Sequence, residues 1–334
     1  MSTPLTLCIT GGAGFIGSHL ADAFLADGHR VIVIDDLSTG RRDNLPASGI
    51  AFHPLDIRSR EAAEVVRSSG IDVLIHQAAQ MDVRRSVDNP HFDADVNVLG
   101  SLNLLEAARQ GGVKRVLFAS TGGAIYGEQN RFPAGENHAL RPLSPYGVAK
   151  LAVERYLYVY HQTYGLDAIS LRYANVYGAR QNPHGEAGVI AIFLDRLLNG
   201  ESPRINGDGL QTRDYVHVAD VVTANRAALN RTGHHVYNVG TGRETSVMQL
   251  CESLRQGLGG TVPEPIFGPG KAGEQRRSCV DPRRGQRDLQ LPDPLDLTDG
   301  LARTIDWFRT RHEAEATQPA PFPRTGAHDH GSAR

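Results

Sequence analysis

The chain has 334 residues, of which 40% are hydrophobic and 22% are charged, and its formal net charge at pH 7 is −2. This balance is typical of a globular protein with a buried core, and it argues against a nucleic-acid partner bound through a basic surface. No apolar run reaches the ~20 residues that cross a membrane, and no signal-peptide pattern opens the chain, so we expect a cytoplasmic protein without a membrane partner.

A glycine-rich turn joins the first predicted strand, over residues 5–10, to the first predicted helix, over residues 15–27. Its sequence is Thr10-Gly11-Gly12-Ala13-Gly14-Phe15-Ile16-Gly17. In a dinucleotide-binding turn Gly11 supplies the tight bend, Gly14 lets a pyrophosphate approach the backbone, and Gly17 lets the helix pack against the strand. The helix N-terminus then offers free N–H groups to the phosphates. An ordinary strand–helix turn is the competing interpretation.

A second predicted strand, over residues 30–35, ends at Asp35. An acid roughly 20 residues beyond the glycines suits the adenosine ribose hydroxyls of a dinucleotide and repels a 2′-phosphate. NAD is therefore favoured over NADP. Arg41 and Arg42 are the local argument for NADP, and we interpret them as solvated side chains.

Strands and helices alternate through the first half of the chain. The predicted strands cover residues 5–10, 30–35, 50–53, 73–77, 113–119 and 168–173. The predicted helices cover residues 15–27, 59–69, 91–109 and 146–164. This alternation predicts an α/β fold, a doubly wound parallel (Rossmann) sheet that binds its ligands beyond the carboxyl ends of the strands.

The alternation loosens after Tyr177. Further helices are predicted over residues 189–199, 219–229, 248–258 and 297–311, and a strand over 236–239. We expect residues 1–178 to form a nucleotide-binding domain, to which 213–242 return, and residues 179–212 and 243–312 to form a smaller, interleaved substrate lobe. The polar residues 313–334 predict a disordered tail. Three distant cysteines, Cys8, Cys251 and Cys279, suit reduced thiols and predict neither a disulfide nor a metal site.

Tyr146 and Lys150 share one face of the helix that opens after Ser144-Pro145. Free tyrosine titrates near ~10, and a neighbouring ammonium or a positive nicotinamide ring lowers that pKa, so the pair predicts a tyrosine base. A surface Tyr–Lys pair is the alternative. The strand before this helix ends in Ser120 and Thr121 over the same crevice, where Thr121 can bind a substrate oxygen or cap a turn.

Nine ordered motifs carry a resemblance to the extended short-chain dehydrogenase/reductase family, and within it to the NAD-dependent sugar-nucleotide epimerases and dehydratases. The resemblance covers about residues 5–312. The matching motifs lie at residues 10–17, 35–40, 56–57, 76–79, 97–100, 120–127, 146–150, 172–178 and 213–218.

The resemblance implies a role for each matching residue. Tyr146 is the expected base, Lys150 holds the nicotinamide ribose and tunes that base, and Thr121 is the hydroxyl partner. The expected cofactor residues are Gly11, Gly14, Phe15, Ile16 and Gly17 at the pyrophosphate, Asp35 at the adenosine ribose, Asp56 and Ile57 at the adenine, Ala78 and Ala79 beside the cofactor, and Asn97 near the sheet centre, together with Asp36 and Ser38. The expected substrate residues are Thr121, Tyr146, Asn175, Arg213, Lys271, Glu274 and Ser278.

The reaction is indicated by the residues after Thr121. Dehydratases of the family carry Asp-Glu there, whereas this chain has Gly122-Gly123, which cannot protonate a leaving hydroxyl. The resemblance therefore implies 4-epimerisation of a UDP-hexose. A UDP-glucuronate epimerase, a dehydratase, a reductase and a catalytically silent nucleotide-binding module are the alternatives.

Three details of the resemblance remain expectations about the site and the assembly. The loop after the strand is one residue longer than the commonest family pattern, which leaves Ser120 as an alternative to Thr121. Ser278 stands where a small residue implies room for N-acetylated hexoses. The resemblance also implies a homodimer that packs through the helices over residues 97–110 and 144–164.

Overall fold

Seven parallel strands form the central sheet of the computed structural model, which describes residues 3–184, 188–270 and 275–317. Their order across the sheet is β11-β6-β5-β4-β1-β2-β3. The strands are β1 (Thr6–Thr10), β2 (Arg30–Ile34), β3 (Ile50–His53), β4 (Val73–His76), β5 (Arg115–Thr121), β6 (Asp167–Tyr173) and β11 (His234–Val239). All six predicted strands of the first half are confirmed, with shifts of at most two residues at their ends.

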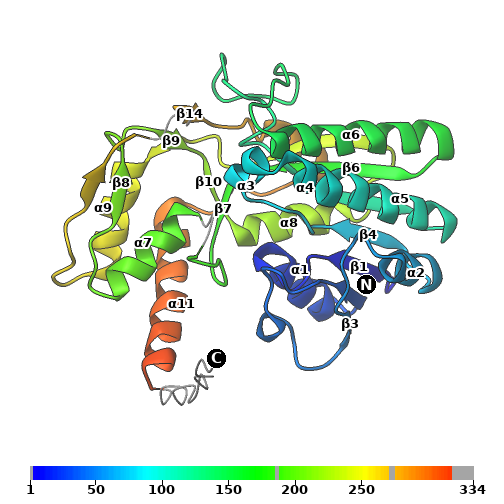
Figure 1. Cartoon of the computed structure of the whole chain (residues 1–334), viewed down its shortest axis with the longest axis horizontal. Coiled ribbons are helices and arrows are strands. Elements are labelled where there is room, and N and C mark those ends of the chain that lie inside the picture. Colours follow the sequence, from blue (N-terminus) through cyan, green and yellow to red (C-terminus); the bar gives the residue numbers. More distant parts are fainter. Residues whose placement is uncertain (1–2, 185–187, 271–274, 318–334) are drawn as a thin grey trace, which may run out of the picture.

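Both faces of this sheet are buried, because its strands are nearly continuous apolar runs. On one face Leu7, Ile9 and Val33 pack against the helices α1 (Phe15–Ala26) and α8 (Val218–Ala228). On the other face Cys8 and Ile32 pack against α2 (Arg60–Ser68), α5 (Gly100–Gln110) and α6 (Pro145–Tyr164). Figure 1 shows the two layers of helices on either side of the sheet. The doubly wound fold is therefore confirmed.

The helix predicted over residues 91–109 is confirmed, but a π-helical turn interrupts it. The chain there forms α4 (Pro90–Ala94), a π-helical turn η2 (Asp95–Leu99) and then α5, and it is preceded by an unpredicted short helix α3 (Val83–Asp88). The wide turn brings the Asn97 amide to the backbone of Gln80, with which it exchanges two hydrogen bonds of 2.9 Å. Single π turns of this kind are frequent at functional sites.

A third apolar cluster lies away from the sheet, among α7 (Val189–Leu198), α9 (Val247–Leu258) and α11 (Leu297–Thr317). Figure 1 shows these helices gathered on one side of the molecule. The remaining elements are η1 (Arg42–Asn44), β7 (Asn175–Tyr177), β8 (Arg204–Asn206), β9 (Thr212–Arg213), β10 (Tyr215–His217), β12 (Thr245–Ser246), β13 (Ile266–Gly268), β14 (Arg277–Ser278) and α10 (Arg283–Leu289). Of residues 213–242, α8 and β11 join the main sheet layer, whereas β9 and β10 pair with β12, β14 and β7 instead.

The disorder predicted for residues 313–317 is wrong. Residues 313–317 continue α11, which is anchored by Leu301, Ile305 and Phe308 at helical spacing in the third cluster. Residues 318–334 lie outside the described residues. Within the described part of the chain, no helix is long and apolar enough to cross a membrane.

Candidate active site

The glycine turn between β1 and α1 has little space for side chains. Gly11 has a φ of +67°, and a Cβ there would lie 2.7 Å from the backbone nitrogen of Ala78. A Cβ on Gly17 would lie 2.1 Å from the Gly11 carbonyl oxygen. Gly14 precedes the first turn of α1, which has neither a side-chain cap nor an acidic residue. The turn therefore presents bare backbone and an uncapped helix N-terminus, as the pyrophosphate of a dinucleotide requires.

Asp35, at the end of β2, stabilises this turn through hydrogen bonds. Its carboxylate is buried and accepts hydrogen bonds from the backbone nitrogens of Ala13, at 2.9 Å, and Leu37, at 2.8 Å. Burial raises the pKa of Asp35, and these two donors oppose that rise. The acid next to it, Asp36, is exposed and accepts from the Ser38 hydroxyl at 2.6 Å. Asp36 and Ser38 thus lie at the open rim beyond the buried Asp35.

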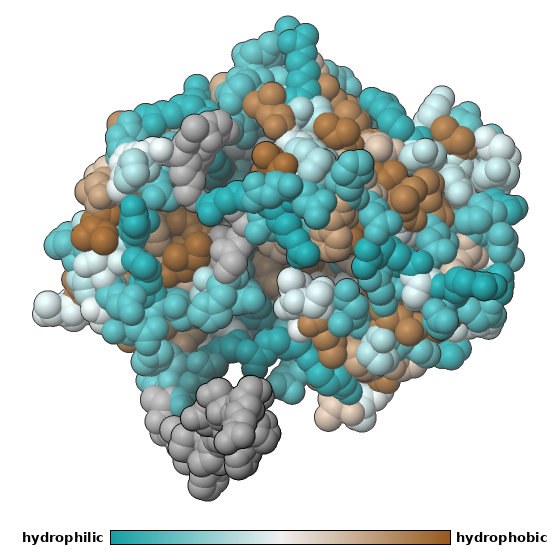
Figure 2. Space-filling view, viewed as in Figure 1, coloured by the Kyte–Doolittle hydropathy of each residue, from teal (hydrophilic) through white to brown (hydrophobic). Residues whose placement is uncertain are grey.

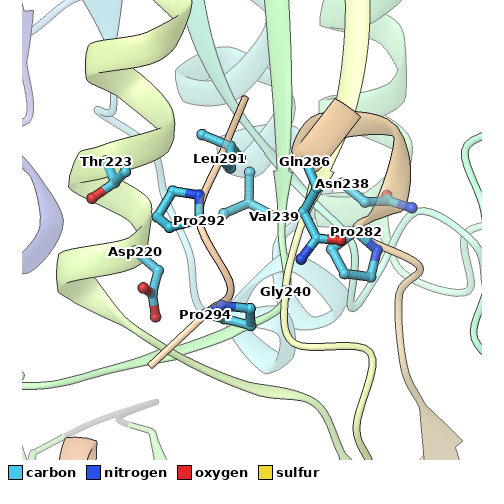
Figure 3. Close-up of a pocket in the computed structure, with 10 residues that line it drawn as sticks. All are labelled: Asp220, Thr223, Asn238, Val239, Gly240, Pro282, Gln286, Leu291, Pro292 and Pro294. Atoms are coloured by element: carbon cyan, nitrogen blue, oxygen red, sulfur yellow. The ribbon is translucent and has the colours of Figure 1, made fainter. Parts of the chain in front are cut away.

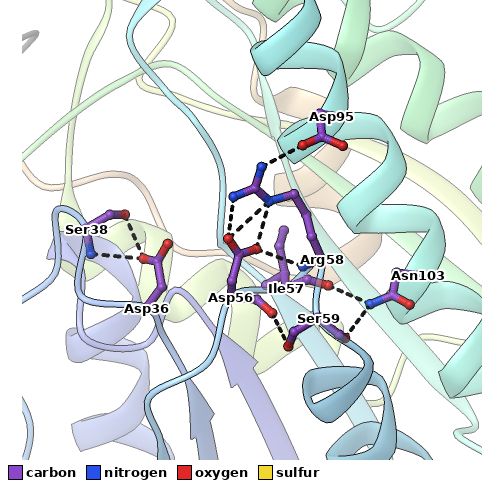
Figure 4. Close-up of polar contacts among 8 residues, drawn as sticks. All are labelled: Asp36, Ser38, Asp56, Ile57, Arg58, Ser59, Asp95 and Asn103. Atoms are coloured by element: carbon purple, nitrogen blue, oxygen red, sulfur yellow. Dashed lines mark hydrogen bonds and ion pairs between the residues drawn. The ribbon is translucent and has the colours of Figure 1, made fainter.

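The expected adenine residues lie near this rim (Figure 4). The Asp56 carboxylate is held by the Arg58 guanidinium, which also donates to Asp95 at 2.6 Å. The same guanidinium lowers the pKa of Asp56. Ile57 is buried, and its carbonyl oxygen accepts from the Asn103 amide at 2.7 Å. The adenine end is therefore already ordered by contacts within the chain.

The residues after β4 lie against the glycine turn. Ala78 donates its backbone N–H to the Thr10 hydroxyl at 3.3 Å, and Ala79 follows it, partly buried. Asn97 is buried and uses its side-chain amide on Gln80 and Asp93. Asn97 thus positions the segment beside the cofactor region through the Gln80 backbone.

Tyr146 and Lys150 are brought together at the start of α6, as predicted. Ser144 caps the helix by accepting from the Gly147 backbone nitrogen at 3.2 Å. Lys150 is 3% exposed, donates to the Ala119 carbonyl oxygen at 2.8 Å and lies 5.8 Å from the centre of the Tyr146 ring. The surface-pair alternative is wrong, because the ammonium is buried beneath the end of β5.

The pKa of Tyr146 differs from the expectation of a lowered value. Burial and the carboxylate of Asp93 raise it in the chain alone, and burial lowers the pKa of Lys150 to about 8. The loss of hydration disfavours both charged forms. A positive nicotinamide ring would favour the Tyr146 phenolate.

The structure distinguishes Ser120 from Thr121. Ser120 is buried and donates to the Glu154 carboxylate at 2.6 Å, and Glu154 also pairs with Arg172 at 2.7 Å. Thr121 is only partly buried, and its hydroxyl lies with the Asn175 side chain around the bare Cα of Gly123. Neighbouring strand residues point to opposite faces, so only Thr121 offers its hydroxyl beside Asn175.

The remaining expected substrate residues lie on the small strands. Arg213 of β9 pairs in register with Ser278 of β14, and Asn175 pairs with Tyr215. The Asp214 carboxylate accepts hydrogen bonds from the Thr241 hydroxyl at 2.6 Å and from the Thr241 backbone nitrogen at 2.9 Å. These bonds disfavour the alternative in which Arg213 is only a structural partner of Asp214. Ser278 is buried, with 3% of its surface exposed. Lys271 and Glu274 lie outside the described residues.

A cavity of about 20 Å³ lies elsewhere, between α8, the end of β11 and the segment that follows α10 (Figure 3). Asp220, Val239 and three prolines are among the residues that line it. Such a volume is on the order of one water molecule. It is therefore too small for a sugar nucleotide.

Comparisons with known proteins agree with this geometry. A model of the "NAD dependent epimerase/dehydratase family" matches residues 7–240. The chain belongs to this family. The resemblance drawn from the motifs is thus confirmed, and so is NAD as the cofactor, which the glycine turn and the acids at the end of β2 fit.

Members of the NAD-dependent epimerase/dehydratase family resemble the chain over almost its whole length. A UDP-glucose 4-epimerase of Mycolicibacterium smegmatis is 44% identical over 310 residues, which cover 91% of this chain and 99% of that protein. The structure of a Thermotoga maritima UDP-glucose 4-epimerase with UDP-glucose matches with a TM-score of 0.89 at 44% identity, over 92% of this chain and 99% of that one. The structure of a Thermus thermophilus UDP-glucose 4-epimerase with NAD matches with a TM-score of 0.86 at 44% identity, over 91% of this chain and 99% of that one.

Proposed function

We propose that the protein catalyses the NAD-dependent 4-epimerisation of a UDP-hexose, interconverting UDP-glucose and UDP-galactose. The observation that carries the proposal is the pair Tyr146–Lys150 beneath a strand end whose next residues are Gly122-Gly123. Because Gly122 and Gly123 supply no acid after Thr121, the site can oxidise and reduce a carbon reversibly but lacks the Asp-Glu pair with which dehydratases expel a hydroxyl. The high similarity to UDP-glucose 4-epimerases supports the same reaction.

Tyr146, Lys150 and Thr121 each have a separate role in this reaction. NAD, when bound, would accept the hydride from C4 of the sugar and give it back to the opposite face. Tyr146 takes the proton of the 4-hydroxyl as C4 is oxidised, and returns it after the 4-keto sugar has turned over in the pocket. Lys150 stabilises the phenolate, and Thr121 binds the reacting oxygen. Proton transfer of this kind contributes about 10²–10⁴ to a rate.

The substrate is held through its nucleotide, which leaves the sugar free to turn. We assign Arg213 of β9 and Asn175 of β7 to the diphosphate and the uridine, as the resemblance implies. We assign these strands and the third apolar cluster to a substrate lobe, and the seven-stranded sheet to the nucleotide-binding domain. Lys271 and Glu274 belong to the same proposal from the resemblance alone.

The assembly in this proposal is a homodimer in the cytoplasm. Exposed apolar side chains follow α6 and the turn before α5, among them Leu99, Val148, Tyr156 and Val159, each at least 41% exposed. Figure 2 shows apolar side chains interrupting the hydrophilic surface over this region. A patch of this kind on adjacent helices suits a second copy of the chain. The three buried, unpaired cysteines suit a reducing compartment.

The test is a coupled assay of the purified protein with UDP-glucose or UDP-galactose and no added reductant. Interconversion in both directions, without net change of NAD, supports epimerisation. Net accumulation of NADH, or release of a 4-keto-6-deoxy sugar, would support an oxidising enzyme or a dehydratase instead. UDP-glucuronate, assayed in parallel, separates the related epimerase.

A further inference from the structure

A buried carboxylate next to the catalytic pair has an oxygen without a partner. Asp93, in α4, is 1% exposed. Its Oδ1 accepts from the Gln80 amide at 3.0 Å and from the Asn97 amide at 2.9 Å. Its Oδ2 is fully buried and has no hydrogen-bond donor among the residues that the structure describes. A buried charged oxygen is costly unless a nearby cation compensates it.

The compensating cation lies on the helix packed against α4. That helix is α6, which carries Tyr146 and Lys150. Lys150 uses one N–H on the Ala119 carbonyl oxygen. Burial raises the pKa of Asp93 and lowers that of Lys150, and the opposite charge of each residue opposes this change in the other. Burial and the Asp93 charge both raise the pKa of Tyr146.

The other titratable groups around this place are neutral or already paired. His76 of β4 bonds Thr10 and Ser101, and burial with the charge of Lys150 lowers its pKa to about 3, which keeps it neutral. Glu154 of α6 is paired with Arg172.

The charged groups on the segments that flank α4 also face other partners. Arg85 of α3 lies over the Phe92 ring at 4.1 Å, and Asp95 of η2 accepts from Arg58. Within the described residues, Asp93 is thus the carboxylate left to balance the buried ammonium.

We propose that Asp93 is the counter-ion of the Tyr146–Lys150 pair: its carboxylate holds Lys150 charged and thereby sets the pH range in which Tyr146 acts as the base. Asp93 is a positioning residue, since it acts through Lys150. This inference rests on the proposed function, in which Tyr146 must lose its proton while Lys150 keeps its own. The two hydrogen bonds to Oδ1 hold the carboxylate in place within the fold.

Asp93→Asn tests the charge while keeping the shape and an oxygen for Gln80 and Asn97. Loss of a negative charge lowers the pKa of every group near it, so both limbs of the pH profile of kcat should move to lower pH. A shift of the alkaline limb by one pH unit is a roughly tenfold loss of kcat above that limb. The phenolate absorbance of the NAD-bound protein, with that of Tyr146→Phe subtracted, should also titrate at lower pH in the variant.

Asp82→Asn is the matched control, because it removes the same charge from the N-cap of α3, where asparagine caps equally well. Gln80→Leu removes a hydrogen bond to Asp93 but keeps the charge. Asp82→Asn should not move the limbs, and Gln80→Leu should move them less than Asp93→Asn does. If Asp93→Asn does not fold, Asp93→Ser replaces it.

The proposal would be overturned if a folded variant with a neutral residue at position 93 kept the pH profile of kcat and the phenolate titration of the wild type. A shift of equal size in Gln80→Leu would assign a structural role to Asp93 and overturn it as well. If the wild-type protein epimerises no sugar nucleotide, the proposed function fails, while the phenolate titration still decides the role of Asp93.

Discussion

Glu154→Ala should destabilise the protein strongly, because Glu154 neutralises the most deeply buried guanidinium of the site region. Its Oε1 accepts from Ser120 at 2.6 Å and from Arg172 Nε at 2.9 Å, and its Oε2 accepts from Arg172 Nη2 at 2.7 Å. Glu154 and Arg172 are 4% and 3% exposed. Removal of one partner of such a pair costs about 3–5 kcal/mol, and the orphaned Ser120 hydroxyl adds about 1 kcal/mol or more.

This cost is a large part of the ~5–15 kcal/mol by which native proteins are stable. Urea unfolding, followed by circular dichroism, measures the change in the free energy of unfolding. Glu64→Ala is the matched control, since the Glu64–Arg67 pair on α2 is about half exposed and should contribute at most about 1 kcal/mol. The double variant Glu154→Leu, Arg172→Met removes both charges and should recover much of the loss.

Two results would refute this reasoning. A loss below about 1 kcal/mol in Glu154→Ala, similar to that of Glu64→Ala, would mean that water or another group neutralises Arg172. A double variant no more stable than Glu154→Ala would mean that the shape of the pair, and not its charge, stabilises the fold.

Four further predictions concern the site. Tyr146→Phe should keep the fold and NAD binding but lower kcat by about 10²–10⁴, and near-normal turnover would remove Tyr146 from the role of base. Wild type should bind NAD more tightly than NADP in a fluorescence titration, and Asp35→Ala should weaken this preference; equal affinities in wild type would refute it. Arg213→Ala should raise the KM for the UDP-sugar about tenfold or more, through loss of a charged hydrogen bond, whereas an unchanged KM with a lowered Tm would indicate a structural arginine. Wild type should epimerise UDP-N-acetylglucosamine as well as UDP-glucose, and Ser278→Tyr should suppress the acetylated sugar selectively; equal slowing of both sugars would contradict the pocket hypothesis.

The fold could be predicted well because its strands are buried on both faces. Continuous apolar runs between helical patterns leave few alternatives to a parallel sheet, and the strand at Val236 could be recognised in the same way. The π turn at residues 95–99 could not be predicted, since it depends on the tertiary hydrogen bonds between Asn97 and Gln80. The two-residue strands β9, β12 and β14 are too short to leave a periodic signal.

The placement of Tyr146 beside Lys150 was predictable, but their pKa values were not. The spacing of Tyr146 and Lys150 placed them on one helix face, but the burial that raises the pKa of Tyr146 depends on the packing of other elements. The sequence could not show which of Ser120 and Thr121 faces the site, because that depends on how side chains alternate between the two faces of β5. One missed residue did leave a signal: Glu154 follows Lys150 by one helical turn, so a second charged residue lies on the catalytic face of α6.

The position of β11 at the edge of the sheet has a consequence for how the protein is made. β11 covers the outer side of β6, yet residues 174–233 separate them in the chain. At about 5–20 residues per second, a ribosome needs roughly 3–12 s to synthesise this stretch. During that time β6 is an unpaired, apolar strand edge, which is a template for aggregation. Nascent chains and truncated products that end before His234 should therefore require chaperones. The chain should reach its native fold only after β11 has been synthesised.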